Sequence, residues 1–378
     1  MVDWLAQYWP AVLLIAVLGV AVLVRLASGW QRRRRPRHTG ERTIRVVGVG
    51  GAGGTAVDDM IDARVGGVDY IAINTDGQFL EESMARRRIR IGDRVTGGLG
   101  AGGDPEMGRI AAEEDAEAIR LALEGSALVF LAAGLGGGTG SGAGPVIAAA
   151  AKELGALTVG VVTLPFEFEG PARRAIADAA VAEMLKSVDT LLVVENERST
   201  ELVTDETSLR DAFRTVNQVL VQAVRGVADI MTVPGLVNVD FADVQSIMRD
   251  GGLGLAGVGQ ASGEGRAVAA AQAAIASPLL AHHIDGAQRI LLNVAAASRM
   301  TLREVIEVAE TVGAAAGAPA RVVFGATSDD RMKDALRVTV IATGFTDGPG
   351  SGSLERPDSG RRRAARDQAG TVSTAAAS

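Results

Sequence analysis

A run of glycines, GLGGGTGSGAGP at residues 134–145, constrains the fold more than any other feature of the sequence. Seven of its twelve residues are glycine, and it separates an apolar stretch at 127–133 from a helix-like stretch at 146–154. Backbone amides at the start of a helix have no partner within it, and the helix dipole favours negative charge there. Because side chains would obstruct a phosphate at such a position, the run predicts a phosphate-binding loop between a strand and a helix.

A second junction of this kind, GVGGAGGTAV at 48–57, follows the apolar stretch TIRVV. Gly48, Gly50 and Gly53 also satisfy the G-x-G-x-x-G pattern of dinucleotide-binding folds, and a tight turn without a ligand is a further alternative for a single loop. A Walker-type loop is excluded, because none of the three lysines follows a glycine. Backbone amides, helix ends and a hydrated Mg²⁺ would then neutralise a triphosphate.

Short β-rich stretches alternate with helical ones from Thr43 onward, which predicts a doubly wound α/β sheet. The predicted buried parallel strands are TIRVVGVG (43–50), VDYIAINTD (68–76), ALVFLAAG (127–134), LTVGVVTLP (157–165) and TLLVVEN (190–196). A helical pattern from Leu209 to Met231 ends at Pro234 and Gly235. The stretches RILLNVAAA, ARVVFGAT and ALRVTVIATGF beyond it predict a second, smaller α+β domain.

Composition and charge exclude several classes of function. The chain has no cysteine and only three histidines, which excludes a disulfide framework, thiolate chemistry and a zinc site of the usual type. Residues 1–42 carry seven arginines against two acidic residues, and residues 347–378 carry five against four. The middle of the chain holds 26 basic and 39 acidic residues, so its net charge of −13 argues against a nucleic-acid partner.

The N-terminus predicts one membrane-spanning helix. The stretch from Ala11 to Val24 is apolar and uncharged, and counted from Trp4 to Leu26 the segment nears the roughly 20 residues that a bilayer requires. The basic QRRRRPR follows directly, so the positive-inside rule leaves the N-terminus outside and the rest of the chain in the cytoplasm. A cleaved signal peptide is the alternative, but such a peptide carries its positive charge before the apolar run.

Six motifs in order resemble the FtsZ family of bacterial cell-division proteins, in the tubulin superfamily. They are INTD (73–76), GLGAGGDPEMG (98–108), GGGTGSG (136–142), PFEFEG (165–170), VNVDFADV (237–244) and RVTVIATGF (337–345). The resemblance runs from about Thr43 to Phe345 and outweighs the dinucleotide-binding alternative. The family's usual loop has Thr where this chain has Ser141, a change that keeps the hydroxyl.

The resemblance implies a domain organisation. It predicts a GTP-binding domain at 43–208, a central helix at 209–233 and a C-terminal activation domain at 234–346. The predicted anchor (1–30) and a basic linker (31–42), which spans at most about 40 Å, precede these parts. A tail at 347–378, rich in Gly, Ser, Ala, Pro and Arg, is predicted to be disordered.

The resemblance also implies contacts with GTP or GDP. The phosphates would be held by Gly51, Ala52, Gly53, Gly54 and Thr55, and by Gly136, Gly137, Gly138, Thr139, Gly140, Ser141 and Gly142. Gly100, Ala101 and Gly102 would approach the γ-phosphate, Glu169 and Arg173 would lie at the ribose and phosphate edge, and Asn196 and Gln218 would face guanine. Mg²⁺ would be held by phosphates and water, without a side chain as ligand.

The acidic segment NVDFADV at 238–244 has two interpretations. From spacing alone, Asp240 is a helix N-cap and Asp243 favours the first turn. In the family that the chain resembles, this loop enters the nucleotide site of the next subunit, which implies that Asn238, Asp240 and Asp243 act on the attacking water or its associated cation. Hydrolysis would then require a head-to-tail filament.

Departures from the family pattern predict altered turnover. Gln218 replaces an aspartate that faces guanine, and its amide offers one acceptor oxygen where a carboxylate offers two. Thr55 replaces an asparagine, and Gly97 replaces an arginine. Asp104, in place of an asparagine, either adds negative charge near the γ-phosphate or caps the helix that begins at Pro105, and we favour the cap.

The resemblance therefore predicts a membrane-anchored GTPase that forms filaments on the cytoplasmic face of the membrane and serves cell division or membrane organisation. The first alternative is a weakly hydrolysing structural modulator that caps or co-assembles with a conventional FtsZ. A dinucleotide-dependent oxidoreductase is the second. The adjacent His282 and His283 lie in a predicted surface turn without acid–base partners nearby in the sequence, so we assign them no catalytic role.

Overall fold

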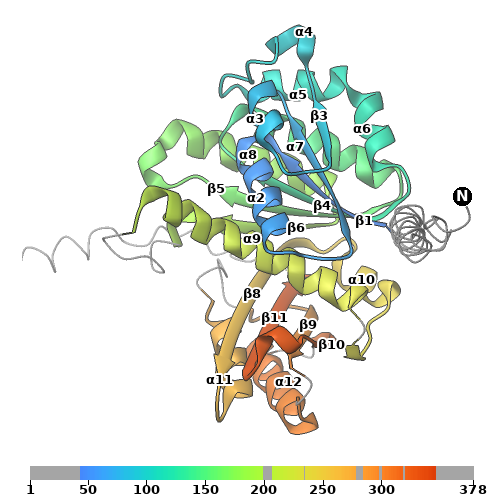
Figure 1. Cartoon of the computed structure of the whole chain (residues 1–378), viewed down its shortest axis with the longest axis vertical. Helices are drawn as coiled ribbons and strands as arrows, with labels where there is room; N and C mark the ends of the chain where they lie inside the picture. Colours follow the sequence, from blue (N-terminus) through green and yellow to red (C-terminus); the bar gives the residue numbers. More distant parts are fainter. Residues whose placement is uncertain are drawn as a thin grey trace, which may run out of the picture. The chain divides into compact units, whose positions relative to one another are not determined.

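The computed structural model of the chain describes residues 43–198, 207–233, 235–277, 284–297, 300–317 and 320–345. Its first half is a parallel sheet in the order β3-β2-β1-β4-β5-β6 (Figure 1). The strands are β1 (Thr43–Val49), β2 (Val68–Asn74), β3 (Arg87–Arg90), β4 (Ser126–Gly134), β5 (Leu157–Leu164) and β6 (Thr190–Glu195). All five strands predicted for this region are therefore present and parallel, and β3 was not predicted.

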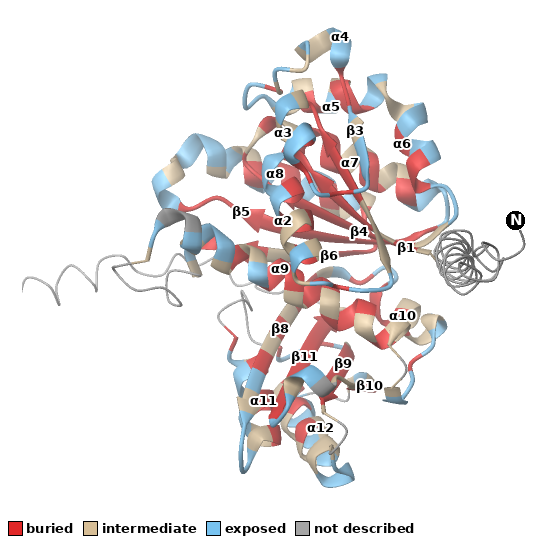
Figure 2. Cartoon of the chain, viewed as in Figure 1, coloured by how far each residue is buried: buried red, intermediate tan, exposed pale blue. Residues whose placement is uncertain are grey.

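Helices cover both faces of this sheet, because alternate side chains of each buried strand point to opposite sides. In β1, Ile44 and Val46 pack with α2 (Gly50–Asp62) and α9 (Leu209–Thr232), whereas Val47 and Val49 pack with the helices of the other face. The helices of that face are α5 (Pro105–Glu114), α6 (Ala116–Leu123), α7 (Gly138–Glu153) and α8 (Pro171–Ser187). Figure 2 shows the strands as a buried interior beneath these helices.

The second half is a mixed sheet in the order β8-β11-β9-β10-β7. Its strands are β7 (Gly235–Val237), β8 (Gly252–Ser262), β9 (Arg289–Ala296), β10 (Arg321–Ser328) and β11 (Ala335–Thr343), and its helices are α10 (Phe241–Met248), α11 (Arg266–Ile275) and α12 (Leu302–Ala316). Apolar residues from α11, α12 and these strands form a separate core. This architecture is the smaller α+β part that the sequence predicts.

The two halves share one continuous sheet of eleven strands, which the sequence analysis did not predict. The join is a parallel pairing of β6 with β8, in which Leu191 lies opposite Leu253. The sheet therefore positions the second half directly beside the last strand of the first.

The helix α9 occupies the region predicted as a central helix, and it packs against both halves: α2 and β5 on one side, and the strands of the second half on the other (Figure 1). Asp229 of α9 forms an ion pair with Arg337 of β11, with Nη2 and Oδ2 3.4 Å apart. Burial raises the pKa of the Asp229 carboxyl, although the charge of Arg337 lowers it, and burial lowers the pKa of the Arg337 guanidinium.

Several predictions lie outside the described residues. These are the N-terminal anchor, the basic linker, the tail after residue 346, and His282 and His283. Within the part of the chain that the structure describes, no helix has the length and apolarity needed to cross a membrane.

Candidate functional site

Two helices begin side by side at the carboxyl ends of neighbouring parallel strands. α2 starts at Gly50 directly after β1, and α7 starts at Gly138 after β4, which pairs with β1. Neither helix has a side-chain cap. The two first turns touch, because a Cβ on Gly50 would lie 3.2 Å from the amide nitrogen of Gly140. Amides that have no intrahelical partner therefore converge from both helices.

Several of these glycines are required by packing. A Cβ on Gly53 would lie 2.3 Å from the carbonyl oxygen of Ala132, so α2 could not approach β4 with any larger residue there. A Cβ on Gly142 would lie 1.9 Å from the carbonyl oxygen of Pro105, so α5 and α7 could not pack as they do. Gly142 and Gly54 also lie beyond the first turn of their helices, where amides bond within the helix.

Gly137, the residue before α7, has no such reason to be glycine. Its backbone is extended, with φ −98° and ψ 171°, a conformation that any residue adopts. Apart from Gly137 itself and its two neighbours in the chain, no atom of the described residues lies within 4 Å of the position that its Cβ would take. The open space beside the amides of α7 is what a phosphate group would fill.

Hydroxyl groups fix the shape of the glycine run. The Gly136 amide donates to the hydroxyl of Ser141 at 2.9 Å, and the Ser141 side chain is buried. The hydroxyls of Thr139 and Thr75 lie 2.7 Å apart, and Thr75 is fully buried at the end of β2. The Ser141 hydroxyl is thus used inside the loop, which explains why the change from Thr to Ser can be accommodated.

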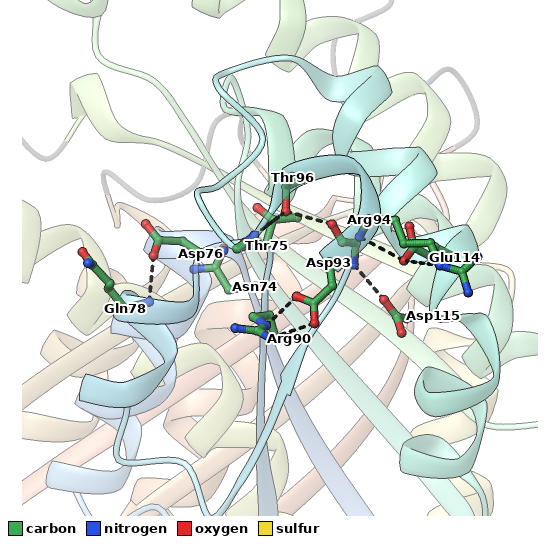
Figure 3. A network of polar contacts seen from close by, with 12 residues as sticks. Asn74, Thr75, Asp76, Gln78, Arg90, Asp93, Arg94, Thr96, Glu114 and Asp115 are labelled. Carbon is green, nitrogen blue, oxygen red and sulfur yellow. Dashed lines mark hydrogen bonds and ion pairs between the residues drawn. The ribbon is translucent and has the colours of Figure 1, made fainter.

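Thr75 also connects the glycine run to the loop at 97–103. Its carbonyl oxygen accepts from the amide of Gly100 at 3.3 Å and from the hydroxyl of Thr96 at 3.5 Å (Figure 3). The base of the loop is held by Asp115, whose carboxylate accepts from the amide of Gly92 at 2.7 Å. The structure therefore joins Gly100, Ala101 and Gly102 to the same region as Thr139.

Asp104 caps α5, as we favoured from the sequence. Its Oδ1 atom accepts from the amide of Glu106 at 2.9 Å, and the residue is exposed. Gly97 is exposed with a positive φ of 60°, and nothing lies near the position of its Cβ. Thr55 is exposed on α2 and donates its hydroxyl to the carbonyl of Gly51 at 3.1 Å.

Glu169 and Arg173 form an ion pair beside the glycine run. Glu169 ends a 3₁₀ turn (η1, Glu167–Glu169) and accepts from Arg173 at 2.5 Å and from the amide of Phe166 at 2.9 Å. A Cβ on Gly136 would lie 3.0 Å from the carbonyl oxygen of Arg173, so the start of α8 borders this run. The two residues are therefore adjacent to the candidate phosphate loop.

An aromatic cluster adjoins this turn and includes a residue that the sequence analysis missed. Phe213, in the second turn of α9, meets Phe166 edge to face with ring centroids 5.3 Å apart. Its side chain is 40% exposed, which is high for a phenylalanine and leaves ring surface for stacking against a base. Gln218 is exposed further along α9, and Asn196 is buried just beyond β6. The run DAFRT at 211–215 reads as an ordinary amphipathic helix, so the sequence carried little signal for Phe213.

The acidic segment lies elsewhere. Asp240 is the N-cap of α10, and its Oδ1 atom accepts from the amide of Asp243 at 2.9 Å. Asn238 accepts from the amide of Gly235 at 2.9 Å. Asn238 and Asp240 are exposed, and Asp243 is half-buried. The local interpretation of Asp240 as a helix cap is therefore correct.

α9 separates the acidic segment from the glycine loops. Its 24 residues span about 36 Å at 1.5 Å per residue. Its beginning lies beside Phe166, near the candidate phosphate loop, whereas Thr232 at its end contacts Gly67, before the amino end of β2. The structure thus brings together the two glycine loops, the loop at 97–103 and the Glu169–Arg173 pair, and leaves the acidic residues near the amino ends of the strands.

Comparisons with known proteins agree with this architecture. Residues 43–204 match the GTPase domain of the tubulin/FtsZ family, and residues 252–346 match the C-terminal domain of the FtsZ family. The structure of an empty FtsZ dimer from M. jannaschii is 40% identical, covering 85% of this chain and 93% of that one with a TM-score of 0.77. CetZ2 from Haloferax volcanii, solved as a GTPγS-bound protofilament, is 23% identical and shares the fold, covering 87% of this chain and all of that one with a TM-score of 0.71.

Proposed function

Since the chain belongs to the tubulin/FtsZ family, whose members include a protein solved as a protofilament, we propose that it is a membrane-anchored GTPase. It polymerises head to tail on the cytoplasmic face of the membrane and hydrolyses GTP at the contact between two copies. Its role is in cell division or in the organisation of the membrane.

The observation that carries this proposal is the pair of uncapped helix N-termini with an open position at Gly137. The first turns of the two helices adjoin at Gly50 and Gly140, and neither first turn has a side-chain cap. A triphosphate fits such a place, because unpartnered amides and helix dipoles favour its charge.

The remaining contacts follow from the neighbours of these loops. We assign the ribose to Glu169, which accepts a hydrogen bond from Arg173 beside the glycine run. Phe213 offers a ring face to the base, and Asn196 and Gln218 offer amide groups to its edge. Mg²⁺ would be held through phosphate oxygens and water.

Hydrolysis is proposed to use the acidic segment of a second copy. Asp240 and Asp243 lie at the far end of α9 from the glycine loops of their own chain, so they cannot act there. A head-to-tail contact would place the acidic segment of one copy against the glycine loops of the next. A carboxylate that is already fixed by capping α10 can then orient or deprotonate the attacking water.

The membrane anchor is proposed from the sequence alone. The apolar segment at 11–24 with QRRRRPR behind it favours one span, with the N-terminus outside and the GTPase in the cytoplasm. Flotation of the full chain with vesicles, resistant to high salt and to carbonate, is the expected result. Release by either treatment would contradict a membrane-spanning segment.

Concentration dependence of GTP turnover tests the catalytic proposal. Turnover per subunit of the full chain in detergent should rise steeply above a critical concentration, together with sedimentable polymer. Turnover that is constant per subunit over the same range would show that one chain suffices, and the shared site would then be wrong.

A second function is favoured by Gln218, whose exposed amide offers guanine one acceptor where the family's aspartate offers two. A chain of this kind could bind nucleotide, hydrolyse little and co-assemble with a conventional FtsZ. The cap made by Asp104 removes one of the arguments for this alternative, because that carboxylate is directed to the amide of Glu106. Co-sedimentation with a conventional FtsZ, with no turnover beyond that of the conventional FtsZ alone, would support the second function.

A further inference from the structure

The carboxyl end of α10 is held by side chains from three different strands. Thr190 of β6 donates its hydroxyl to the carbonyl of Met248 at 2.5 Å, and Thr343 of β11 donates to the carbonyl of Ile247 at 2.7 Å. Both threonines are fully buried. The last carbonyls of a helix have no intrahelical partner, so these two bonds fix the position of the helix end.

Arg289, at the start of β9, provides the third and largest contact. Its Nη1 atom donates to the carbonyls of Arg249 at 2.9 Å and Ser246 at 3.4 Å, and its Nη2 atom donates to the carbonyl of Asp250 at 3.0 Å. Asp250 has a positive φ of 49°, a conformation uncommon for a residue other than glycine. One guanidinium therefore binds three carbonyls at the negative end of the helix dipole and holds the strained turn that follows α10.

α10 connects this contact to the acidic residues. It has only eight residues, about 12 Å at 1.5 Å per residue, and Asp240 and Asp243 lie at its other end. A helix this short moves as a unit, so a shift at its carboxyl end is transmitted to the two carboxylates. A misplacement of about 1 Å caused by a change far from the chemistry can lower a rate by about 10²-fold.

We propose that Arg289 is a positioning residue for GTP hydrolysis, which sets where Asp240 and Asp243 stand relative to the next subunit. This inference rests on the proposed function, because it requires the acidic segment to act in the site of a second copy. Arg289 lies outside the nucleotide contacts, so it affects turnover without affecting GTP binding. Arginine suits the position because its rigid, planar fork has five donors, whereas lysine is a point charge on a flexible stem.

The test compares Arg289→Met and Arg289→Lys with the full wild-type chain in detergent. Methionine keeps much of the stem and removes every donor, and lysine keeps the charge. Arg321→Met is the matched control. Arg321 is exposed and lies opposite Arg289 in the parallel pairing of β10 with β9. The measurements are GTP affinity, sedimentable polymer, and turnover divided by the amount of sedimented subunit.

We expect Arg289→Met to bind GTP within twofold of wild type and to form filaments, with turnover per sedimented subunit reduced by about 10- to 100-fold. The turnover per sedimented subunit of Arg289→Lys should lie between those of Arg289→Met and wild type. That of Arg321→Met should match wild type. A purely structural role would lower the melting temperature and the yield of polymer but leave turnover per sedimented subunit unchanged.

Turnover per sedimented subunit within twofold of wild type in both Arg289 variants would overturn the inference. Where Arg289→Met does not fold, the lysine variant decides by the same criterion. Wild-type turnover that does not rise with concentration refutes the proposed function itself, and the inference fails with it.

Discussion

Replacing Gly137 by alanine separates phosphate binding from folding. The residue has φ −98° and ψ 171°, and among the described residues only its own two chain neighbours come within 4 Å of the new methyl group. The folded state therefore accepts alanine without strain. The unfolded chain loses conformational entropy, so the free energy of unfolding should rise by roughly 0.4–1 kcal/mol. The methyl group would nonetheless stand in the space that we assign to a phosphate.

We expect the Gly137→Ala chain, stripped of nucleotide, to unfold at the same or a higher denaturant concentration than wild type. Its affinity for a fluorescent GTP analogue should fall at least tenfold, or about 1.4 kcal/mol. Stability that is kept or raised while GTP affinity falls would mean that the ligand, and not the folded protein, requires glycine at this position.

Gly142→Ala is the matched control within the same run. Its Cβ would lie 1.9 Å from the carbonyl oxygen of Pro105 and 2.7 Å from the amide nitrogen of Arg109, so α5 and α7 must separate. Such overpacking costs about 1–3 kcal/mol or more, against a gain of about 1 kcal/mol in helix propensity. The Gly142→Ala chain should therefore unfold at a lower denaturant concentration than wild type. Nucleotide affinity within threefold of wild type in a stable Gly137→Ala chain would refute phosphate binding by this loop.

Three further predictions test other parts of the site. Asp240→Asn keeps a good N-cap, so unfolding should change by less than about 0.5 kcal/mol, while turnover per sedimented subunit should fall by about 10²-fold or more; unchanged turnover would leave Asp240 as a cap alone. Gln218→Asp gives guanine a second acceptor, so the preference for GTP over inosine triphosphate should grow roughly tenfold in a competition assay, and an unchanged ratio would place the base elsewhere. Burial raises the pKa of Asp229 above 3.8 in the folded chain, so the unfolded chain releases this proton at a lower pH. The free energy of unfolding of the wild type should therefore fall relative to that of Asp229→Asn as the pH rises from 3.8 to the raised pKa. A rise in the free energy of unfolding over that pH interval, measured by denaturation, would mean that the ion pair with Arg337 has a larger effect on the pKa of Asp229 than burial has.

The parts of the fold that the sequence predicts are those with a strong local signal. Buried parallel strands read as continuous apolar runs, and glycine clusters mark their ends, so β1, β4 and the starts of α2 and α7 were predictable. β8 was missed because its sequence, GLGLAGVGQAS, is rich in glycine and alanine, which are poor strand formers. The structure explains the composition, because a Cβ on Gly259 would lie 2.1 Å from the carbonyl oxygen of Ala270 in α11. Close packing by a distant helix overrides the local preference.

The candidate site divides in the same way. The amide-lined loops are local features, whereas Phe213 and Arg289 gain their significance only from what the fold brings beside them. Phe213 is one apolar residue of an amphipathic helix until Phe166 is known to meet it. Arg289 is a charged residue at the start of an apolar strand, and its three carbonyl partners lie 39 to 43 residues away in the chain. Contacts of that separation leave no periodic or compositional trace in a single sequence.

Asp240 shows that a structural and a catalytic interpretation of one residue need not compete. Capping occupies only Oδ1, which accepts from the amide of Asp243, and the residue is exposed. The cap thus restricts the orientation of the side chain without using Oδ2. A carboxylate held in this way loses little entropy when a second subunit arrives, which is the condition under which a general base is effective. Because α10 is anchored at its other end by Arg289, the cap supplies the direction of the carboxylate and the anchor supplies its position.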